Sequence, residues 1–379
     1  MKQISFLLVT LGIMLTFAAC DRSTITAHIK NLGNDTVYVE YIPLTDYYAR
    51  NMNTLVRDTV VAVNDKFTYT ISGNDDVVIE FTTARAGQAI TFPAVNHADR
   101  IKIAGAIEDS DLSYTATGTV VVEAQSQQEL VNKPLIVQID SLENLYKVIM
   151  GSMTPDDSAI NNIREAYKNL ILEKQANDLT YIKSNPASDY SGYLLTRQPI
   201  DTFNVYYEKL ADNVKTGTFK EPLELCAKRY DDYLQRKLNE ENVKPGAAAP
   251  VFTLKNLDGK DVCLTDIQGK YIVLDFWGSW CSWCVRGYPR MKEYYAKYKK
   301  KVEFVGIACN DNDEDWRNAV QKNELQWTQL FHPKEDNVPI RYAVKGFPTK
   351  VILDSEYKIV GVFEGESDEF YEKLDKLFK

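Results

Sequence analysis

The hydrophobic and polar positions of the 379-residue chain follow a strand-like pattern over residues 23 to about 123. Short alternating runs, rich in β-branched and aromatic side chains, are separated by turn signals such as Asn64-Asp65. Strands at this spacing predict a small antiparallel β-sandwich or barrel. The polar residues 21–30 that precede them are typical of a tether rather than of a folded core. The expected strands are 36–42, 58–63, 66–71, 77–83, 100–106 and 119–124.

The apolar spacing becomes helical from residue 125 to about 242. A helix start is indicated at Thr154-Pro155-Asp156-Asp157, where a capping hydroxyl precedes a proline at the first helical position and acids in the first turn. That helix should end before Asn185-Pro186, because the residue before a proline is pushed out of the α region. Residues 124–243 are therefore expected to form a helical connector. Its further helical stretches are expected at 189–196, 202–213 and 221–241.

A second change of pattern follows residues 244–252, KPGAAAPVF, which are small, bracketed by prolines and typical of a linker. Beyond them strands and helices alternate, and a β-hairpin and a helix complete the chain. This order predicts an α/β, thioredoxin-like domain over residues 244–379, with a central mixed sheet flanked by helices. Its strands are expected at 252–256, 261–266, 271–277, 302–309, 350–354 and 359–364, and its helices at 281–300, 313–323 and 368–378.

The first twenty residues have the layout of a secretory signal peptide. One early lysine, Lys2, precedes an apolar run from Ile4 to Ala19. The run is shorter than the ~20 residues that a membrane-spanning helix needs, so an uncleaved anchor helix is the less favoured alternative. Ala18-Ala19-Cys20 resembles a bacterial lipoprotein signal, which implies removal of residues 1–19, acylation of Cys20 and tethering at the periplasmic or other extracytoplasmic face of a membrane. The β domain would then begin at residue 20 and extend to residue 123.

Charge and cysteine content narrow the function. A net charge of −9 argues against nucleic-acid binding, which needs a basic surface. Six cysteines are present, and if Cys20 carries lipid, five remain. Export would place them where disulfides persist, so a reactive cysteine pair would be chemically meaningful there.

Cys281 and Cys284 form a C-x-x-C pair in the segment DFWGSWCSWC. Zinc binding by such a pair needs two further soft ligands at matching spacing, and neither the solitary remaining cysteines nor His28, His97 and His332 follow such a pattern. A purely structural disulfide is the other alternative. A redox pair fits better, because it would follow an apolar strand and open a helix, whose N-terminal amide groups and dipole favour a thiolate.

This segment, followed by Pro289 and by GFPT at residues 346–349, resembles thioredoxin. With the entry sequence APVFTLKNLDGK, residues 245–379 resemble more closely the membrane-tethered thiol-disulfide oxidoreductases of the TlpA/ResA type. The resemblance implies an enzyme that exchanges disulfides with protein substrates, acts as a reductase and is re-reduced by a membrane electron donor. Cytochrome c maturation is one function of that family. We expect no cofactor and no metal, and the region before residue 245 resembles an uncharacterised module of lipoproteins from Bacteroidetes-type bacteria.

The resemblance assigns a role to each residue of the pair and to the segment that faces it. Cys281 is the nucleophile that forms a mixed disulfide with the substrate, and Cys284 resolves that intermediate. Pro348 matches the family's cis-proline, which has no amide hydrogen to donate. Phe347, the residue before it, offers backbone hydrogen bonds to an extended substrate.

Four further side chains belong to this expected site. Asp275 matches the buried acid that removes a proton from the resolving cysteine, although strand 302–309 offers no lysine to partner it. Trp280 matches one of the family's aromatic residues, and we expect it to contact substrate together with Ser282 and Trp283. The latter two residues depart from the usual dipeptide between the cysteines, so the redox potential of the family cannot be transferred.

Two other functions stay open as alternatives. The APVFTL entry also occurs in peroxiredoxins, but Gly278 stands where that family needs a threonine or serine. A non-catalytic binding lipoprotein would use the fold as a scaffold, which the intact cysteine pair argues against. Cys226, Cys263 and Cys309 are expected to be inert core residues, because buried cysteine behaves as a small hydrophobe.

Overall fold

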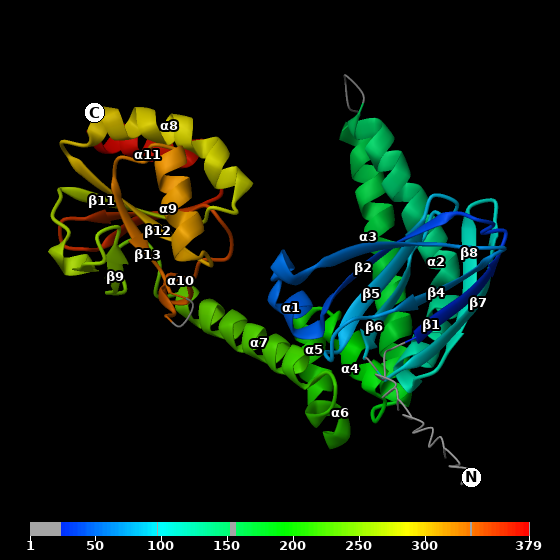
Figure 1. Cartoon of the computed structure of the whole chain (residues 1–379). Helices are drawn as coiled ribbons and strands as arrows, with labels where there is room; N and C mark the ends of the chain where they lie inside the picture. Colours follow the sequence, from blue (N-terminus) through cyan, green and yellow to red (C-terminus); the bar gives the residue numbers. More distant parts are fainter. Residues whose placement is uncertain (1–23, 97, 152–156, 334–335, 379) are drawn as a thin grey trace, which may run out of the picture. The chain divides into compact units, whose positions relative to one another are not determined.

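The computed structural model describes residues 24–96, 98–151, 157–333 and 336–378. The chain divides into two compact units, Met1–Ala227 and Lys228–Lys379 (Figure 1). The expected signal peptide, Cys20, His97 and the helix start at Thr154-Pro155-Asp156 lie outside the described residues. Among the helices that are described, none is both long enough and apolar enough to cross a membrane.

The first unit begins with β1 (Thr24–Lys30), β2 (Thr36–Pro43), α1 (Leu44–Ala49), η1 (Met52–Thr54), β3 (Val56–Val61), β4 (Lys66–Thr70), β5 (Val77–Thr83), β6 (Ile90–Val95), β7 (Arg100–Glu108) and β8 (Asp111–Thr117). These strands form two sheets, in the orders β4-β1-β7-β8 and β3-β2-β5-β6. Paired strands are antiparallel except β1 and β7, which are parallel. Inward side chains of both sheets, including Ile25, Val39 and Phe92, share one core. The expected antiparallel β domain is confirmed.

The expectation that residues 21–30 are a tether is wrong for Thr24–Lys30, which form β1. Ile25, Ala27 and Ile29 alternate with polar residues and are buried in the core. Strand β1 itself lies between β4 and β7 in its sheet. Since alternate residues of a strand face the same side, three small or branched apolar side chains are enough to bury one face of an otherwise polar segment.

The strand expected at residues 119–124 is also wrong, because a helix begins at Val120. The Thr119 hydroxyl caps this helix by accepting the amide hydrogen of Val122 at 3.2 Å. Glu123 accepts the amide hydrogen of Gly118 at 3.1 Å. β-Branched residues lower helix propensity only slightly, so these two hydrogen bonds and burial of Val121 and Val122 outweigh the strand-like composition.

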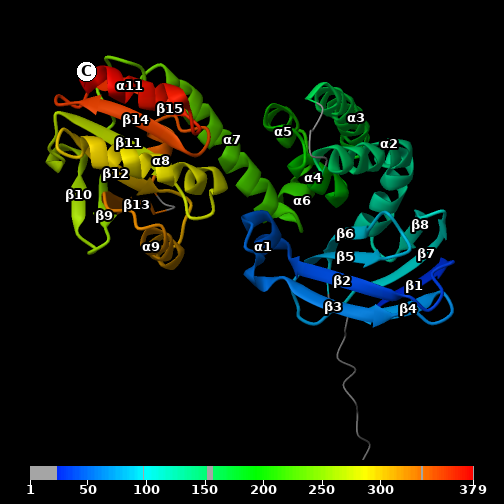
Figure 2. The same ribbon diagram turned by 90° about the horizontal axis from the view of Figure 1, so that it is seen from above.

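The rest of the first unit is helical: α2 (Val120–Met150), α3 (Asp157–Ser184), α4 (Asp189–Thr196), α5 (Ile200–Tyr207), α6 (Asp212–Thr216) and the first residues of α7 (Lys220–Glu240). Helices α2 and α3 lie side by side (Figure 2). Buried Asp178 of α3 accepts hydrogen bonds from Gln128 and Asn132 of α2, which fixes their register. The single helix expected at 202–213 is wrong, since the chain turns after α5 and Ala211 donates its amide hydrogen to Pro186 at 3.0 Å.

The second unit contains the end of α7 followed by β9 (Thr253–Asn256), β10 (Asp261–Cys263), η2 (Leu264–Asp266), β11 (Tyr271–Trp277), α8 (Ser282–Tyr298), β12 (Val302–Ala308), α9 (Asp313–Lys322), β13 (Thr328–Phe331), α10 (Val338–Arg341), β14 (Thr349–Asp354), β15 (Ile359–Glu364) and α11 (Asp368–Phe378). The strands form one mixed sheet in the order β10-β9-β13-β12-β11-β14-β15. β11, β12 and β13 are parallel, whereas β14 is antiparallel to β11. The thioredoxin-like architecture is confirmed, and β13 and α10 are elements that the hydrophobic pattern did not indicate.

Strand β11 lies in the interior of this sheet and is buried on both faces. Ile272, Leu274 and Phe276 point into one apolar cluster, and Val273 and Trp277 point into another that also contains side chains of α8, α9 and α11. Such double burial explains why β11 reads as a nearly continuous apolar run, which Asp275 interrupts. The chain therefore leaves a strand that is fixed in the core shortly before α8 begins.

Candidate redox site

The cysteine pair lies at the start of α8, as the sequence pattern predicts. Cys281 is the N-cap residue of this helix, and its Sγ accepts the amide hydrogen of Cys284 at 3.1 Å. The two cysteines form a disulfide, with their Cα atoms 5.3 Å apart. Both are buried, but Ser282 and Trp283 between them are exposed. The free amide groups and dipole at this helix end favour a negative charge on Cys281 when the disulfide is reduced.

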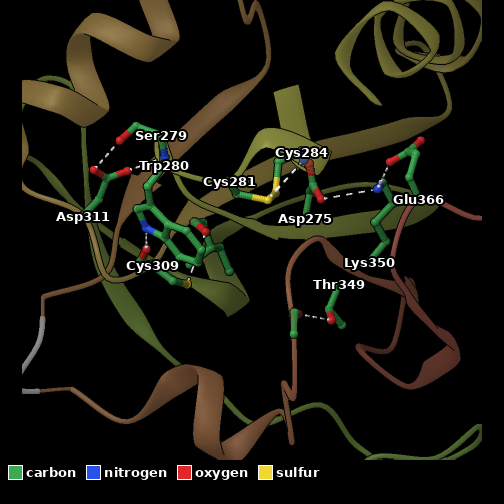
Figure 3. Close-up of a disulfide and its surroundings, with 12 residues drawn as sticks. Asp275, Ser279, Trp280, Cys281, Cys284, Cys309, Asp311, Thr349, Lys350 and Glu366 are labelled. Atoms are coloured by element: carbon green, nitrogen blue, oxygen red, sulfur yellow. Dashed lines mark hydrogen bonds and ion pairs between the residues drawn. A yellow bond between two sulfur atoms is a disulfide. The ribbon is translucent and has the colours of Figure 1, made fainter. Parts of the chain in front are cut away.

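The loop between β11 and α8 is anchored by an aspartate that sequence reasoning missed. Ser279 donates its amide hydrogen to Asp311 at 2.6 Å and its hydroxyl hydrogen at 2.7 Å (Figure 3). Asp311 follows β12, which is parallel to β11. Because parallel strands end at the same edge of a sheet, an acid two residues after the apolar segment 302–309 was the available signal.

Trp280 and Trp283, on either side of Cys281 in the chain, are both exposed. Trp280 is 53% exposed, and its indole N–H donates to the carbonyl oxygen of Cys309 at 3.1 Å. It packs edge-on against Phe347, with ring centroids 5.3 Å apart. The Phe347–Pro348 peptide bond is cis. Trp283 is 61% exposed, with the guanidinium of Arg286 5.0 Å from its ring centroid.

Asp275 lies on β11 and is almost completely buried, at 4% exposure. Burial raises the pKa of its carboxyl to about 6; the Lys350 ammonium opposes this rise and the Glu366 carboxylate adds to it. In Figure 3 the carboxyl of Asp275 is drawn between the disulfide and Lys350. A group with a pKa near neutrality can both accept and return a proton at physiological pH.

The lysine near Asp275 comes from β14, not from the strand at 302–309. β14 pairs with β11 so that Lys350 lies directly opposite Asp275, and its Nζ is 3.9 Å from Oδ1. Glu366, on the segment after β15, accepts a hydrogen bond from the same Nζ at 2.7 Å. Sequence reasoning missed both residues. The signal for Lys350 was a lysine inside the apolar strand TKVILD, where a buried charge needs a partner.

The other cysteines differ in burial. Cys226 and Cys309 are buried, as expected, and burial raises the pKa of the Cys309 thiol. The expectation of a core position is wrong for Cys263, which is only half-buried because it ends the short strand β10 and precedes the turn η2. Within the described ranges, no group of three or more histidine, cysteine or acidic side chains is placed to hold a metal ion.

Comparison with known proteins identifies the family of the second unit. Residues 245–362 match the model of the AhpC/TSA family. The thiol-disulfide oxidoreductase ResA of Bacillus cereus is 32% identical over 151 residues, which cover 40% of this chain and 84% of that protein. The chain belongs to the ResA-type thiol-disulfide oxidoreductases. ResA of Bacillus subtilis is 29% identical, with 38% of this chain and 81% of that protein covered.

A solved structure is similar to this part of the ResA-type chain as well. The thioredoxin domain of a thiol-disulfide oxidoreductase from Bacteroides vulgatus is 33% identical and covers 36% of this chain and 98% of its own, with a TM-score of 0.34. The relatives named as ResA confirm the expected enzyme class, thiol-disulfide oxidoreductase.

Proposed function

We propose that the chain reduces protein disulfides at the extracytoplasmic face of a membrane, with Cys281 as the nucleophile and Cys284 as the resolving cysteine. The observation that carries this proposal is the position of Cys281 at the tip of α8, where its Sγ accepts the Cys284 amide hydrogen. In the reduced protein the same amide would stabilise a thiolate on Cys281, the form that attacks a disulfide. Exposed Trp280 and Trp283 offer apolar surface beside it.

The proposed reaction transfers two electrons from the cysteine pair to the substrate. The Cys281 thiolate bonds to one substrate sulfur, and the other substrate sulfur leaves as a thiolate. Cys284 then gives its proton to the Asp275 carboxylate and attacks the Cys281 sulfur. This closes the Cys281–Cys284 disulfide and releases the second substrate thiolate; both substrate thiolates take up protons. A thiol-bearing electron donor at the membrane must reduce the pair before the next cycle.

Five residues are proposed to position the substrate. An extended polypeptide would hydrogen-bond to the backbone of Phe347, in the manner of an added strand. Pro348 has no amide hydrogen, so it presents no competing donor to the disulfide. Trp280 packs on Phe347 and would extend the surface that contacts the substrate. Ser282, which is exposed between the cysteines, is proposed to contact substrate with Trp283 and to influence how strongly the pair reduces.

The direction of electron flow is tested by the reduction potential of the pair. We expect a value closer to that of thioredoxin, about −270 mV, than to that of the oxidant DsbA, about −120 mV. Purified protein would be equilibrated with dithiothreitol or glutathione couples and followed by tryptophan fluorescence, since Trp280 and Trp283 adjoin the disulfide. Insulin reduction in dithiothreitol would be measured in parallel. A potential near −120 mV would reverse the proposed direction.

Peroxide reduction is the second candidate, because the matching AhpC/TSA model leaves it open. The position three residues before Cys281 argues against it. A Cβ atom at Gly278 would lie 2.5 Å from the indole nitrogen of Trp280, so the threonine or serine that peroxiredoxins need has no room in this arrangement. Peroxide consumption by the reduced protein, at a rate above that of dithiothreitol alone, would favour the peroxidase instead.

Membrane attachment is proposed to depend on Cys20. The motif Ala18-Ala19-Cys20 supports acylation of this cysteine after removal of residues 1–19. We expect Cys20→Ser to move the exported protein from the membrane fraction to the soluble periplasmic fraction in a bacterial host, with insulin reduction unchanged. Cys226→Ser is the matched control and should remain with the membrane. Equal membrane retention of both variants, or an N-terminus without lipid by mass spectrometry, would contradict the anchor.

A further inference from the structure

Three charged groups form a row that leads away from the disulfide: Asp275 on β11, Lys350 on β14 and Glu366 after β15 (Figure 3). The side chains of Asp275 and Lys350 are 6% and 3% exposed, and that of Glu366 is 18% exposed. Two carboxylates therefore share one ammonium group, largely out of water. Burying such charges is costly unless each of them is paired or hydrogen-bonded.

Glu366 is the carboxylate that holds the shared lysine. The Lys350 Nζ lies 2.7 Å from Glu366 Oε2 but 3.9 Å from Asp275 Oδ1, which is too far for a hydrogen bond. Buried Oδ1 of Asp275 accepts no hydrogen bond from the described residues. The phenol of Tyr371 donates to Glu366 Oε1. Glu366 is thus fixed by two donors, whereas the carboxyl nearer the disulfide is left without one at Oδ1.

Helix α8 leaves room for the Glu366 carboxylate about one turn after the proposed resolving cysteine, Cys284. Gly287 follows Cys284 by three residues, and a Cβ atom built on it would overlap with Oε2 and the carboxylate carbon of Glu366. Any side chain at this position would push Glu366 away from Lys350 or distort the helix. Glycine has a low helix propensity, so its presence inside α8 is explained by the carboxylate it admits.

We propose that Glu366 is a positioning residue of the redox site, which holds the Lys350 ammonium away from Asp275 and so keeps the Asp275 carboxyl free to exchange a proton with Cys284. The proposal rests on the function proposed above. If Lys350 were released, it would pair with Asp275 and bind the ionised carboxyl too firmly for it to accept a proton near neutral pH. Glu366 acts through the lysine and does not contact the sulfur atoms.

The other titratable groups that face Asp275 carry no charge that could replace this control. Tyr288 of α8 and Cys309 after β12 both have pKa values raised by burial, so they are neutral where Asp275 titrates. Tyr371 of α11 is likewise protonated, and it donates to Glu366. Asp311 is hydrogen-bonded to Ser279 in the neighbouring loop. The charges of Lys350 and Glu366 therefore dominate the electrostatic potential at the Asp275 carboxyl.

The test is the pH dependence of disulfide reduction by single-turnover stopped flow, with tryptophan fluorescence as the signal and a disulfide-bonded peptide as the substrate. The part of the pH–rate profile that disappears in Asp275→Asn is the kinetic limb that belongs to this carboxyl. We expect Glu366→Gln to lower the midpoint of that limb by about one pH unit, because an opposite charge at close range shifts a carboxyl pKa by at least that much. Lys350→Met should raise it. Glu364→Gln removes the same charge from an exposed position and should leave it unchanged.

Gly287→Ala provides a second variant that leaves all three charged residues in place. It should shift the midpoint in the same direction as Glu366→Gln. A midpoint that does not move in Glu366→Gln, or that moves upward, would overturn the proposal, as would equal shifts from Glu364→Gln.

A readout independent of catalysis separates this failure from failure of the proposed function. The oxidised protein loses stability as the pH rises from the unfolded-state pKa of Asp275 to its folded-state pKa, so the pH at which the fall in its urea midpoint ends reports the same carboxyl. If Asp275 is not the proton acceptor, the kinetic limb will survive in Asp275→Asn, but the stability transition will still move downward in Glu366→Gln. If Glu366 does not control Lys350, the stability transition of Glu366→Gln will coincide with that of the unsubstituted protein.

Discussion

Cys281→Ser should abolish insulin reduction, whereas Cys284→Ser should accumulate as a mixed disulfide with its substrate. The nucleophile in disulfide exchange is a thiolate, and a serine hydroxyl at the same helix tip is not ionised at neutral pH. We expect the rate to fall by at least about 10³-fold in Cys281→Ser, the scale of effect seen when a catalytic nucleophile is removed. In Cys284→Ser the first attack can proceed, but the second sulfur needed to release the substrate is missing.

The measurement combines insulin turbidity with mass spectrometry of adducts formed on a disulfide-bonded peptide. Cys263→Ser is the matched control, since Cys263 is a free and only half-buried cysteine in the same unit. It should keep full activity and form no adduct. Activity retained in Cys281→Ser, or a trapped adduct on Cys281→Ser rather than on Cys284→Ser, would reverse the proposed order of attack.

Asp275→Asn should make the oxidised protein more stable and less active. The pKa of Asp275 rises from 3.8 to about 6 on folding, a shift of about two units. At about 1.4 kcal/mol per unit, ionisation of this buried carboxyl costs about 3 kcal/mol of stability once it is complete. Removing the charge should therefore raise the free energy of unfolding by about that amount at pH 7.5, while resolution slows by about 10²-fold through loss of the proton acceptor.

The sign of the pH dependence makes this prediction specific. Because the folded-state pKa lies above the unfolded value, the cost is absent below about pH 3.8 and is complete above about pH 6. The gain in Asp275→Asn should therefore vanish as the pH falls towards 4. Urea unfolding followed by tryptophan fluorescence reports the second unit within the intact chain, since all five tryptophans are at position 277 or later.

Asp258→Asn is the control for loss of a carboxylate, since Asp258 is exposed in the turn after β9. It should change the unfolding free energy by less than about 0.5 kcal/mol at either pH. A gain in Asp275→Asn that is equal at pH 4 and pH 7.5 would show that packing, and not ionisation, causes the change.

Local patterns predicted the parts of the molecule in which a segment's own residues decide its structure. The apolar run at 271–277 became β11, and the cysteines that follow it became the first turn of α8. Composition misled where side-chain hydrogen bonds at a helix start, or an alternating buried face, decided the outcome. The cap at Thr119 starts helix α2 in a segment rich in β-branched residues. The buried, alternating side chains of Ile25, Ala27 and Ile29 make a strand of a segment that is otherwise polar.

The sequence by itself determined the chemistry of this protein: a cysteine pair at a helix tip, an acid in the preceding strand and a thioredoxin-like order around them. The first two depend on residues close together in the chain, and the third depends on the order of local elements along it. Only the tertiary structure decided how the acid is controlled, because Lys350 reaches Asp275 through the antiparallel pairing of β14 with β11. Glu366 reaches the lysine over a glycine of α8. Strand pairing and helix packing bring such charges together from distant segments, so no local pattern can predict which of them share a partner.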